Sequence, residues 1–309
     1  MPVYLTEEDV EALLSIEDAL EAVDGSFRRQ AAGEIEIRPR YRLGLDGGVL
    51  AVMAAADSGL GLAGVKTYAA GRGGASFVLA LFDATSQEQL ALIEADRLGQ
   101  LRTGAATGVA AKFLAREGAA TLGVIGCGWQ AETQIAAVRA AVPSIEQTIV
   151  FCRDPDRREA FARRMGAEAA ESHREAAEHD VVVTITTSKD PVVRGEWLRP
   201  GALVCAAGAN IASRRELDNE VLARAAFVCC DLKDDAMIES GDLIEPIGQG
   251  VLDWLEVHEL CEVVAGEVAG RQSDDDVVVF KSNGIASWDV AIGAVAIARA
   301  RERGIGRDL

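Results

Sequence analysis

The stretch Thr121-Leu122-Gly123-Val124-Ile125-Gly126-Cys127-Gly128-Trp129-Gln130-Ala131 runs from an apolar strand into a turn of the form G-x-G-x-x-A. In this pattern Gly126 permits a tight turn, Gly128 lets the backbone approach a pyrophosphate, and Ala131 leaves room for a helix to pack on the strand. The N-terminus of that helix offers free N–H groups and a positive dipole end to phosphates. The stretch therefore predicts a dinucleotide-binding turn.

The segments after the turn support this interpretation. Residues 132–142 have the apolar spacing of a helix, and residues 148–152 form a second apolar strand. Further strands are expected at 181–186, 203–207 and 227–230, and helices at 155–165, 174–179 and 216–224. Such alternation predicts a parallel sheet with the cofactor at the carboxyl ends of its strands. The alternative is a structural glycine turn in another α/β domain.

The end of the second strand bears on which nicotinamide cofactor is bound. NAD-binding proteins usually place a carboxylate there to accept from the ribose 2′-hydroxyl, whereas an arginine favours the 2′-phosphate of NADP. This chain has Cys152-Arg153-Asp154, and Arg153 can pair with a phosphate. Alternatively, Arg153 is a solvated loop residue and Asp154 caps the helix that follows Pro155. These residues favour NADP(H) and leave NAD(H) open.

Composition excludes several classes of partner. With 309 residues, 49% of them hydrophobic, the chain is long enough for two domains with cores of their own. Its net charge of −18 makes nucleic acid and anionic membranes poor partners. The six cysteines show no C-x-x-C spacing and the three histidines no metal-ligand spacing, so we expect no metal site. Without a charged leader or a long apolar run, we expect a cytoplasmic protein that does not contact membranes.

The region before the turn reads as a mixed α+β domain. Helices are expected from Thr6, at 16–32 and at 98–116, and short strands at 40–45, 49–55, 64–68 and 77–82. A last helical run at 284–303 is expected to return to this domain. We therefore predict an α/β fold in which a doubly wound parallel sheet, residues 119–284, is inserted into an α+β domain of residues 1–118 and 285–309.

Three basic residues of the first domain stand among apolar or glycine neighbours: Arg40, Lys66 and Arg102. Arginine binds a carboxylate through two parallel hydrogen bonds, and lysine is a point charge that can also move a proton. For each of them alone, a surface ion pair is an equally good interpretation. Their joint occurrence predicts a site for a small organic acid.

Five motifs follow one another in a fixed order: Arg102-Thr103-Gly104-Ala105-Ala106, the turn 126–131, Arg215-Glu216-Leu217-Asp218, Glu239-Ser240-Gly241-Asp242-Leu243 and Phe280-Lys281-Ser282-Asn283-Gly284-Ile285-Ala286. In these motifs the chain resembles the ornithine cyclodeaminase/mu-crystallin family over nearly its whole length. The resemblance implies a Rossmann-type nucleotide domain joined to a domain that binds substrate and forms a homodimer. It also implies hydride transfer between a nicotinamide and a carbon that bears nitrogen next to a carboxylate.

The resemblance also implies roles for single residues. Arg40, Lys66 and Arg102 would hold the substrate carboxylate, and Asn283 would face the substrate. Cofactor contacts would come from residues of the turn and from four further positions: Gly126, Gly128, Trp129, Gln130, Ala131, Thr103, Arg153, Arg214 and Ser282. For Glu239 and Asp242 we prefer a cap and an ion pair that hold a loop.

One departure limits the resemblance. Where the cyclodeaminases carry a catalytic aspartate, this chain reads Gly208-Ala209-Asn210. An asparagine cannot act as a general base. Reduction of an iminium needs only a hydride, a carboxylate clamp and one polar group near nitrogen. We therefore expect an imine or ketimine reductase, or an alanine-type amino-acid dehydrogenase, with Lys66 and Asn210 as catalytic residues.

Two alternatives remain open at this stage. An ornithine cyclodeaminase would convert ornithine to proline and ammonia, with Lys66 or a bound water in place of the missing carboxylate. A catalytically silent protein would use NADPH to shape a pocket for a small ligand, as mu-crystallin's hormone binding suggests for this family.

Overall fold

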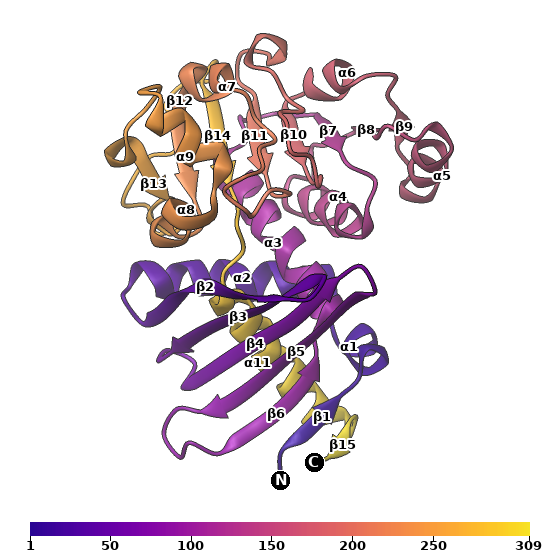
Figure 1. Ribbon diagram of the computed structural model, residues 1–309, viewed down its shortest axis with the longest axis vertical. Helices are drawn as coiled ribbons and strands as arrows, with labels where there is room; N and C mark the ends of the chain where they lie inside the picture. Colours follow the sequence, from indigo (N-terminus) through magenta and orange to yellow (C-terminus); the bar gives the residue numbers. More distant parts are fainter. The chain divides into compact units, whose positions relative to one another are not determined.

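The computed structural model describes residues 1–309, and the chain divides into two compact units (Figure 1). The first unit comprises residues 1–102 and 285–309, and the second comprises residues 103–284. The second unit is thus an insertion in the chain of the first. Its first boundary falls inside helix α3 (Asp96–Leu114), whereas the sequence placed it after that helix, at residue 118.

A seven-stranded mixed sheet forms the first unit, in the order β15-β1-β6-β5-β4-β3-β2. Its strands are β1 (Val3–Leu5), β2 (Ile35–Leu45), β3 (Gly48–Asp57), β4 (Leu62–Gly71), β5 (Gly74–Asp83), β6 (Gln89–Glu94) and β15 (Arg307–Asp308). Its helices are α1 (Glu7–Leu13), α2 (Ile16–Ala31), the start of α3, and α11 (Ala286–Arg303). The four long strands and these helices confirm the α+β prediction, while the short strands β1, β6 and β15 were not predicted.

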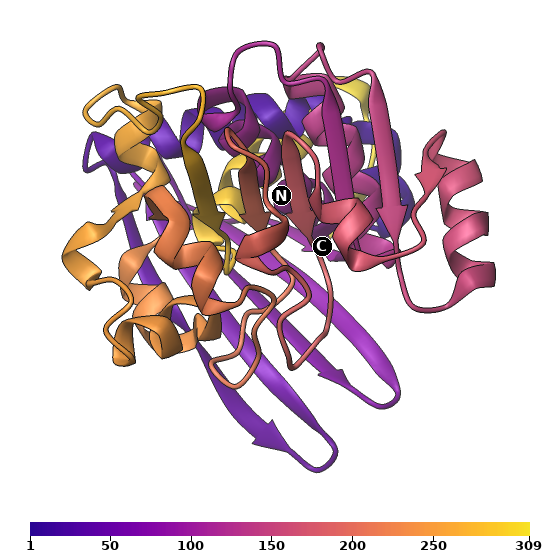
Figure 2. The same ribbon diagram turned by 90° about the horizontal axis from the view of Figure 1, so that it is seen from above.

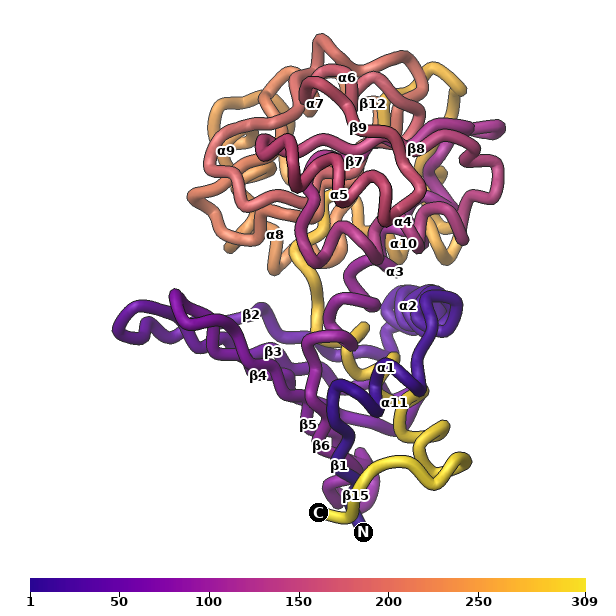
Figure 3. The backbone as a smooth tube through the Cα atoms, turned by 90° about the vertical axis from the view of Figure 1, so that its right-hand side faces the viewer, coloured from indigo at the N-terminus to yellow at the C-terminus, as the bar shows by residue number.

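Helices α2 and α11 pack on each other, and α11 packs on β3 and β4. Figure 3 shows both helices on the same side of the sheet. Burial alternates along β3 accordingly, because Ala51, Met53 and Ala55 are buried while the residues between them stay partly exposed. Helices α1 and α2 begin where the sequence placed them, since Thr6 and Ser15 each form a capping box.

Eight parallel strands form the sheet of the second unit, in the order β13-β12-β14-β11-β10-β7-β8-β9 (Figure 2). The strands are β7 (Thr121–Ile125), β8 (Gln147–Phe151), β9 (Glu168–Ala169), β10 (Val181–Thr184), β11 (Leu203–Ala206), β12 (Ala225–Cys230), β13 (Val257–Glu259) and β14 (Val277–Lys281). The helices are α4 (Trp129–Ala141), α5 (Pro155–Met165), α6 (His173–Ala177), α7 (Asn219–Arg224), α8 (Lys233–Glu239), α9 (Gly241–Gly248) and α10 (Leu260–Val264), with 3-10 turns at Gly195–Trp197 and Trp254–Glu256. This arrangement confirms the predicted fold class.

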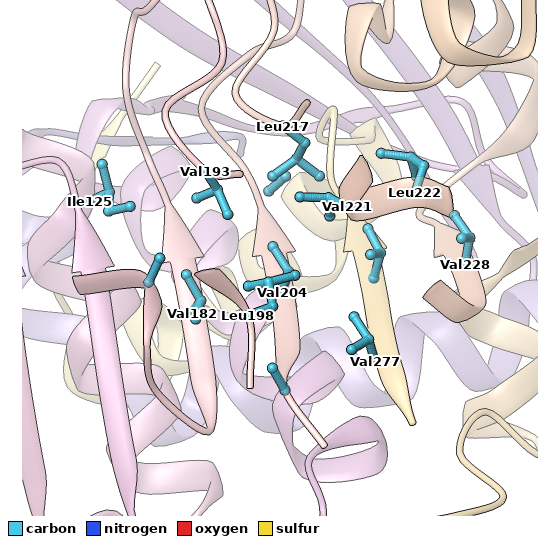
Figure 4. Close-up of a cluster of buried hydrophobic side chains, with 14 of the residues drawn as sticks. Ile125, Val182, Val193, Leu198, Val204, Leu217, Val221, Leu222, Val228 and Val277 are labelled. Carbon is cyan, nitrogen blue, oxygen red and sulfur yellow. The ribbon is translucent and has the colours of Figure 1, made fainter. Parts of the chain in front are cut away.

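The order of the strands reverses at β7, which pairs with β8 on one side and with β10 on the other. In doubly wound sheets, ligands bind outside the carboxyl ends of the strands at such a switch point. Strands β10, β11 and β14 contribute Val182, Val204 and Val277 to a cluster of buried hydrophobic side chains (Figure 4). The sheet is therefore a rigid base for the loops that leave its carboxyl edge.

The predicted helix at 216–224 is wrong in its first part. Helix α7 begins only at Asn219, because Asp218 caps it by accepting from the backbone N–H of Val221. Glu216 lies in the preceding loop, where its fully buried carboxylate accepts hydrogen bonds from backbone N–H groups. Strands β13 and β14 and helices α8, α9 and α10 were not predicted.

None of the helices is both long enough and apolar enough for a membrane crossing. All six cysteines are free thiols, and five of them are buried.

Candidate functional site

Of the three basic residues singled out in the first unit, two pair with one carboxylate and the third acts on the lysine of that pair. Asp289, on α11, accepts from Lys66 Nζ at 2.7 Å and from Arg102 Nε at 3.2 Å, both on its oxygen Oδ1. Arg40, Lys66 and Arg102 are only 5%, 2% and 8% exposed. Arg40 also acts electrostatically on Lys66. A strand bulge, a central strand and two helices thus build one buried cluster of charge.

A bulge in β2 accounts for the burial of Arg40. The pairing of β2 with β3 shifts between Arg38 and Tyr41, on either side of Pro39 and Arg40. Arg38 and Tyr41 are exposed and Arg40 is buried. In a regular strand Arg40 would share the exposed face of Arg38, so the extra residue turns its side chain inward. Proline suits this position because it has no N–H to pair.

Lys66 stands at the middle of the sheet, paired with Met53 on β3 and Leu79 on β5. Burial and the Arg102 charge lower its pKa to about 7, although Asp289 opposes both effects. A lysine that titrates near neutrality can give up and take back a proton during a reaction.

The cluster gathers three buried cations. Lys66 and Arg102 pair with Asp289, and the charge of Arg40 acts on Lys66. The Arg102 guanidinium also lies 5.8 Å from the ring centroid of Trp288. Buried charges of one sign are costly unless an opposite charge joins them. An organic acid supplies such a charge, and its carboxylate matches the planar guanidinium.

The predicted dinucleotide turn in the second unit has the backbone that the motif requires. Gly126 has a φ of +125°, and a Cβ atom there would lie 2.3 Å from the carbonyl oxygen of Ile185. A Cβ at Gly128 would meet only Arg157, at 3.9 Å, so space is open beside that residue. Helix α4 starts at this point without a side-chain cap, and its first N–H groups are available to an anion.

Two more residues of the turn fit a bound nucleotide. The side chain of Trp129 is exposed, and Oε1 of Gln130 is buried without a hydrogen-bond donor. Buried polar atoms normally have a partner, and a ligand at the turn can supply one. Ala131 is fully buried, which brings α4 close to the sheet. Thr103, on α3, is half-buried, and its carbonyl accepts from Gln134 Nε2 of α4 at 3.2 Å.

The ribose end of the site differs in part from the sequence-based picture. Arg153 is exposed, and Asp154 caps α5 by accepting from the N–H of Arg157, which confirms the cap interpretation. Sequence reasoning gave no role to Arg157, whose Nε donates to the carbonyl of Cys127 in the glycine turn at 3.0 Å. A signal was present, because a cation in the first turn of a helix opposes the helix dipole and calls for another reason.

The loop that carries Asn210 follows β11, and two buried side chains hold its backbone in place. Glu216 accepts from the N–H groups of Gly208 at 2.7 Å and Ala209 at 3.1 Å. Lys281 Nζ donates to the carbonyl of Ala209 at 2.5 Å. A Cβ at Gly208 would lie 2.2 Å from the backbone nitrogen of Thr186, so only glycine fits there. Asn210 itself is half-buried.

Asp242 completes the network under this loop. Its Oδ1 accepts from the N–H groups of Glu216 at 2.7 Å and Leu217 at 2.9 Å, and its Oδ2 lies 3.0 Å from Lys281 Nζ. This confirms that Asp242 forms an ion pair that holds a loop. Glu239, which was grouped with it, is buried in the last turn of α8.

Asp231 fixes the segment after β14 in a similar way. Its Oδ2 accepts from Ser282 Oγ at 3.2 Å and from the N–H groups of Asn283 at 2.8 Å and Gly284 at 2.6 Å. The hydroxyl of Ser282 thus donates to a carboxylate within the fold, and Ser282 and Asn283 are both buried. Arg214, another expected cofactor contact, is half-buried in the loop before Glu216.

The structure therefore brings the expected residues together in two groups. Arg40, Lys66 and Arg102 meet in the first unit, around an aspartate that the sequence reasoning missed. The turn 126–131 with Arg157, and the loops of Asn210 and Asn283, lie at the carboxyl edge of the sheet in the second unit. Asp289 could have been found, because an acid between apolar residues of a helix must be paired when it is buried.

Known proteins share this architecture. The chain matches the ornithine cyclodeaminase/mu-crystallin family over residues 1–304. An alanine dehydrogenase of Archaeoglobus fulgidus is 35% identical over 313 residues, which cover 98% of this chain and 96% of that protein. The solved Thermococcus litoralis Δ1-pyrroline-2-carboxylate reductase, in complex with NADH and L-proline, has a TM-score of 0.93 at 31% identity and covers 99% of this chain and 100% of that one. A solved archaeal alanine dehydrogenase dimer with bound NAD has a TM-score of 0.94 at 32% identity and covers 100% and 98%.

Proposed function

The chain belongs to the ornithine cyclodeaminase/mu-crystallin family, and from this premise we propose that it reduces the C=N bond of a small α-imino acid and oxidises the corresponding α-amino acid. It is an NAD(P)-dependent oxidoreductase that acts on amino or imino acids. The observation that supports the proposed reaction is the cluster of three buried cations in the first unit, two of which pair with Asp289.

Each residue of the cluster has a proposed task. Arg40 and Arg102 orient the substrate carboxylate, and their charge stabilises the anion throughout the reaction. The nicotinamide cofactor supplies or accepts the hydride at the α-carbon. Lys66 gives a proton to the imine nitrogen in the direction of reduction, and in the direction of oxidation it takes a proton from the amine. Its pKa of about 7 suits both directions.

Asn210 distinguishes this reaction from cyclodeamination. The loop that carries it is fixed by Glu216 and Lys281, so its amide can hold a polar substrate atom in a defined place. An amide does not titrate near neutral pH and cannot act as a general base, so it serves an imine reductase or a dehydrogenase better than a cyclodeaminase, in which a carboxylate takes that role. Δ1-pyrroline-2-carboxylate, and pyruvate with ammonia, are the first substrates to test, because relatives are named for these activities.

We propose NADP(H) as the preferred cofactor, although solved relatives hold NADH or NAD. Asp154 is committed to the cap of α5, and Arg157 lies beside the glycine turn. We expect Arg153→Ser and Arg157→Ser to weaken NADPH binding about tenfold and NADH binding little. Arg163→Ser, on the exposed side of the same helix, serves as the matched control. Equal losses for both cofactors would refute the preference.

We propose that the enzyme is a homodimer that uses the sheet face opposite α11. Tyr41, Leu43 and Leu45 lie on one face of β2, and each is about half exposed. An apolar stripe of this kind marks an interface in most proteins. Sedimentation equilibrium is expected to give twice the monomer mass for the native chain, and monomers for the variant Leu43→Asp/Leu45→Asp. A native monomer would contradict the proposal.

The direct test of the reaction is a panel of cyclic imino acids and of 2-keto acids with ammonia, each followed with NADH and with NADPH. We expect at least one of them to be reduced, with an amino acid as the product. Tight NADPH binding without oxidation across the panel would instead identify a silent binding protein. Release of proline and ammonia from ornithine without net NADH would identify a cyclodeaminase.

A further inference from the structure

The proposed function gives no role to Asp289, although burying its carboxylate costs free energy unless cations compensate the charge. Asp289 is fully buried on α11, between the buried side chains of Trp288 and Val290. Both of its hydrogen bonds, from Lys66 and Arg102, reach the same oxygen, Oδ1. The other oxygen, Oδ2, is buried and receives no hydrogen bond. The charge of this carboxylate is therefore compensated by the two cations.

The cations depend on the carboxylate in turn. Lys66 faces Arg102 from α3 and Arg40 from β2, and both of them disfavour a third positive charge. Asp289, from α11, is the negative charge that acts most strongly on Lys66. Without it, three buried cations would face one another at short range in a poorly solvated place, and the lysine would be the one to lose its proton.

We infer that Asp289 is the positioning residue of this site: its carboxylate anchors the Lys66 ammonium and the Arg102 guanidinium on one oxygen and favours the charged form of the lysine before substrate arrives. The inference rests on the proposed function for its catalytic consequence, but not for its effect on Lys66. A substrate carboxylate then joins a cluster whose cations are already in place, and no group has to move before the proton transfer.

The inference predicts the direction of a titration. In Asp289→Asn the anion is lost while Arg40 and Arg102 remain, so the pKa of Lys66 falls below its native value of about 7 by at least about one pH unit. In Asp289→Glu the charge is kept, and the pKa is expected to stay close to the native value. The matched control is Asp57→Asn, which removes another fully buried carboxylate of the same unit, paired with Arg29 at 2.9 Å.

Lys66 can be observed directly in the full-length protein. Lysine occurs only at positions 66, 112, 189, 233 and 281, so a protein labelled with ¹³C at lysine Cε gives few signals, each assignable by a single substitution. Their chemical shifts are followed by NMR against pH in the native chain and the three variants. Circular dichroism first shows that each variant is folded, and Asp289→Glu carries the test if Asp289→Asn is not.

The second readout is the pH profile of kcat/KM for imine reduction. We expect the limb that falls above about pH 7 to move to lower pH in Asp289→Asn, with a loss of about tenfold at pH 7, and to stay in place in Asp57→Asn. A Lys66 signal that titrates unchanged in Asp289→Asn overturns the inference, and so does a change of more than about one unit in Asp289→Glu. A shifted Lys66 signal in a protein that reduces no imine leaves the inference standing and refutes the proposed function.

Discussion

Each of the two units buries a cluster of charged side chains, and different partners hold the two clusters in place. In the first unit Lys66 and Arg102 share the carboxylate of Asp289, and the charge of Arg40 acts on Lys66. In the second unit Lys281 pairs with Asp242. The carboxylates of Asp242 and Glu216 also accept hydrogen bonds from backbone N–H groups. The carboxylates of the second cluster accept from backbone N–H groups, whereas Asp289 in the first accepts from two side chains and one of its oxygens has no hydrogen bond. Partners from the backbone thus indicate a structural role, and buried cations held by another side chain suit the binding of a ligand.

Removal of Lys66 is expected to have the largest effect, and it tests whether the first cluster serves the reaction and not the fold. In Lys66→Met we expect kcat/KM to fall by about a thousandfold, because the proton donor is lost, while the affinity for NADPH and the free energy of unfolding change little. Coenzyme fluorescence and urea unfolding measure the last two quantities. If the variant lost its stability and its affinity for NADPH together with its activity, Lys66 would have a structural role, and the two clusters would not differ in function.

The corresponding change in the second unit is expected to act on stability. Lys281→Met leaves the fully buried Asp242 without its cation, so the free energy of unfolding should fall by about 3–5 kcal/mol. Urea unfolding measures this loss, and Lys112→Met, at an exposed position, is the control. A variant as stable as the native chain would show that the network under the Asn210 loop is not what holds it.

The first cluster should also be visible in the pH dependence of turnover. Lys66 must be protonated for reduction, so the reductive kcat/KM falls as the pH rises through about 7, the pKa of Lys66. It must be neutral for oxidation, so the oxidative rate rises over the same range. Steady-state rates in both directions, in buffers of constant ionic strength, provide the test. Two profiles that fall together would remove the lysine from the proton transfer.

The smallest expected effect concerns charges outside both clusters. The net charge of −18 destabilises the folded state through repulsion at the surface. Salt screens exposed charges far more than buried ones. Raising KCl from about 0.05 to 0.5 M should therefore raise the melting temperature by a few degrees, about 1 kcal/mol, and by the same amount in native chain and Lys281→Met. A larger gain in the variant would mean that salt reaches the buried network.

The sequence predicted those features that depend on short, periodic signals. The strand, turn and helix at 121–141, the helix that begins at Thr6, the helix from residue 16, and the parallel sheet all follow from local patterns. The joint occurrence of Arg40, Lys66 and Arg102 also indicated one site. The carboxylate that joins them could not be located in this way, because Asp289 lies far along the chain from Lys66 and its role depends on the packing of α11 against β4.

Other misses have the same physical origin. Glu216 reads as the start of a helix because nothing local shows that its side chain is bound by Gly208 and Thr186. The bulge that buries Arg40 is visible only when β2 is paired with β3. Arg157 follows the strand by several residues and reaches the turn through its long side chain. The roles of these three residues depend on contacts between segments far apart in the chain, and a local sequence pattern does not show such contacts.

Deuterium transfer shows directly whether the hydride of the coenzyme reaches the α-carbon of the imino acid. The enzyme is given coenzyme deuterated at C4 of the nicotinamide, in each of the two stereoisomers, together with the best imino acid of the panel, and the amino acid formed is analysed by NMR and mass spectrometry. We expect that one stereoisomer of the coenzyme places a single deuterium on the α-carbon, beside the carboxylate that we propose Arg40 and Arg102 hold. An amino acid without deuterium from either stereoisomer, formed while coenzyme is consumed, would contradict it.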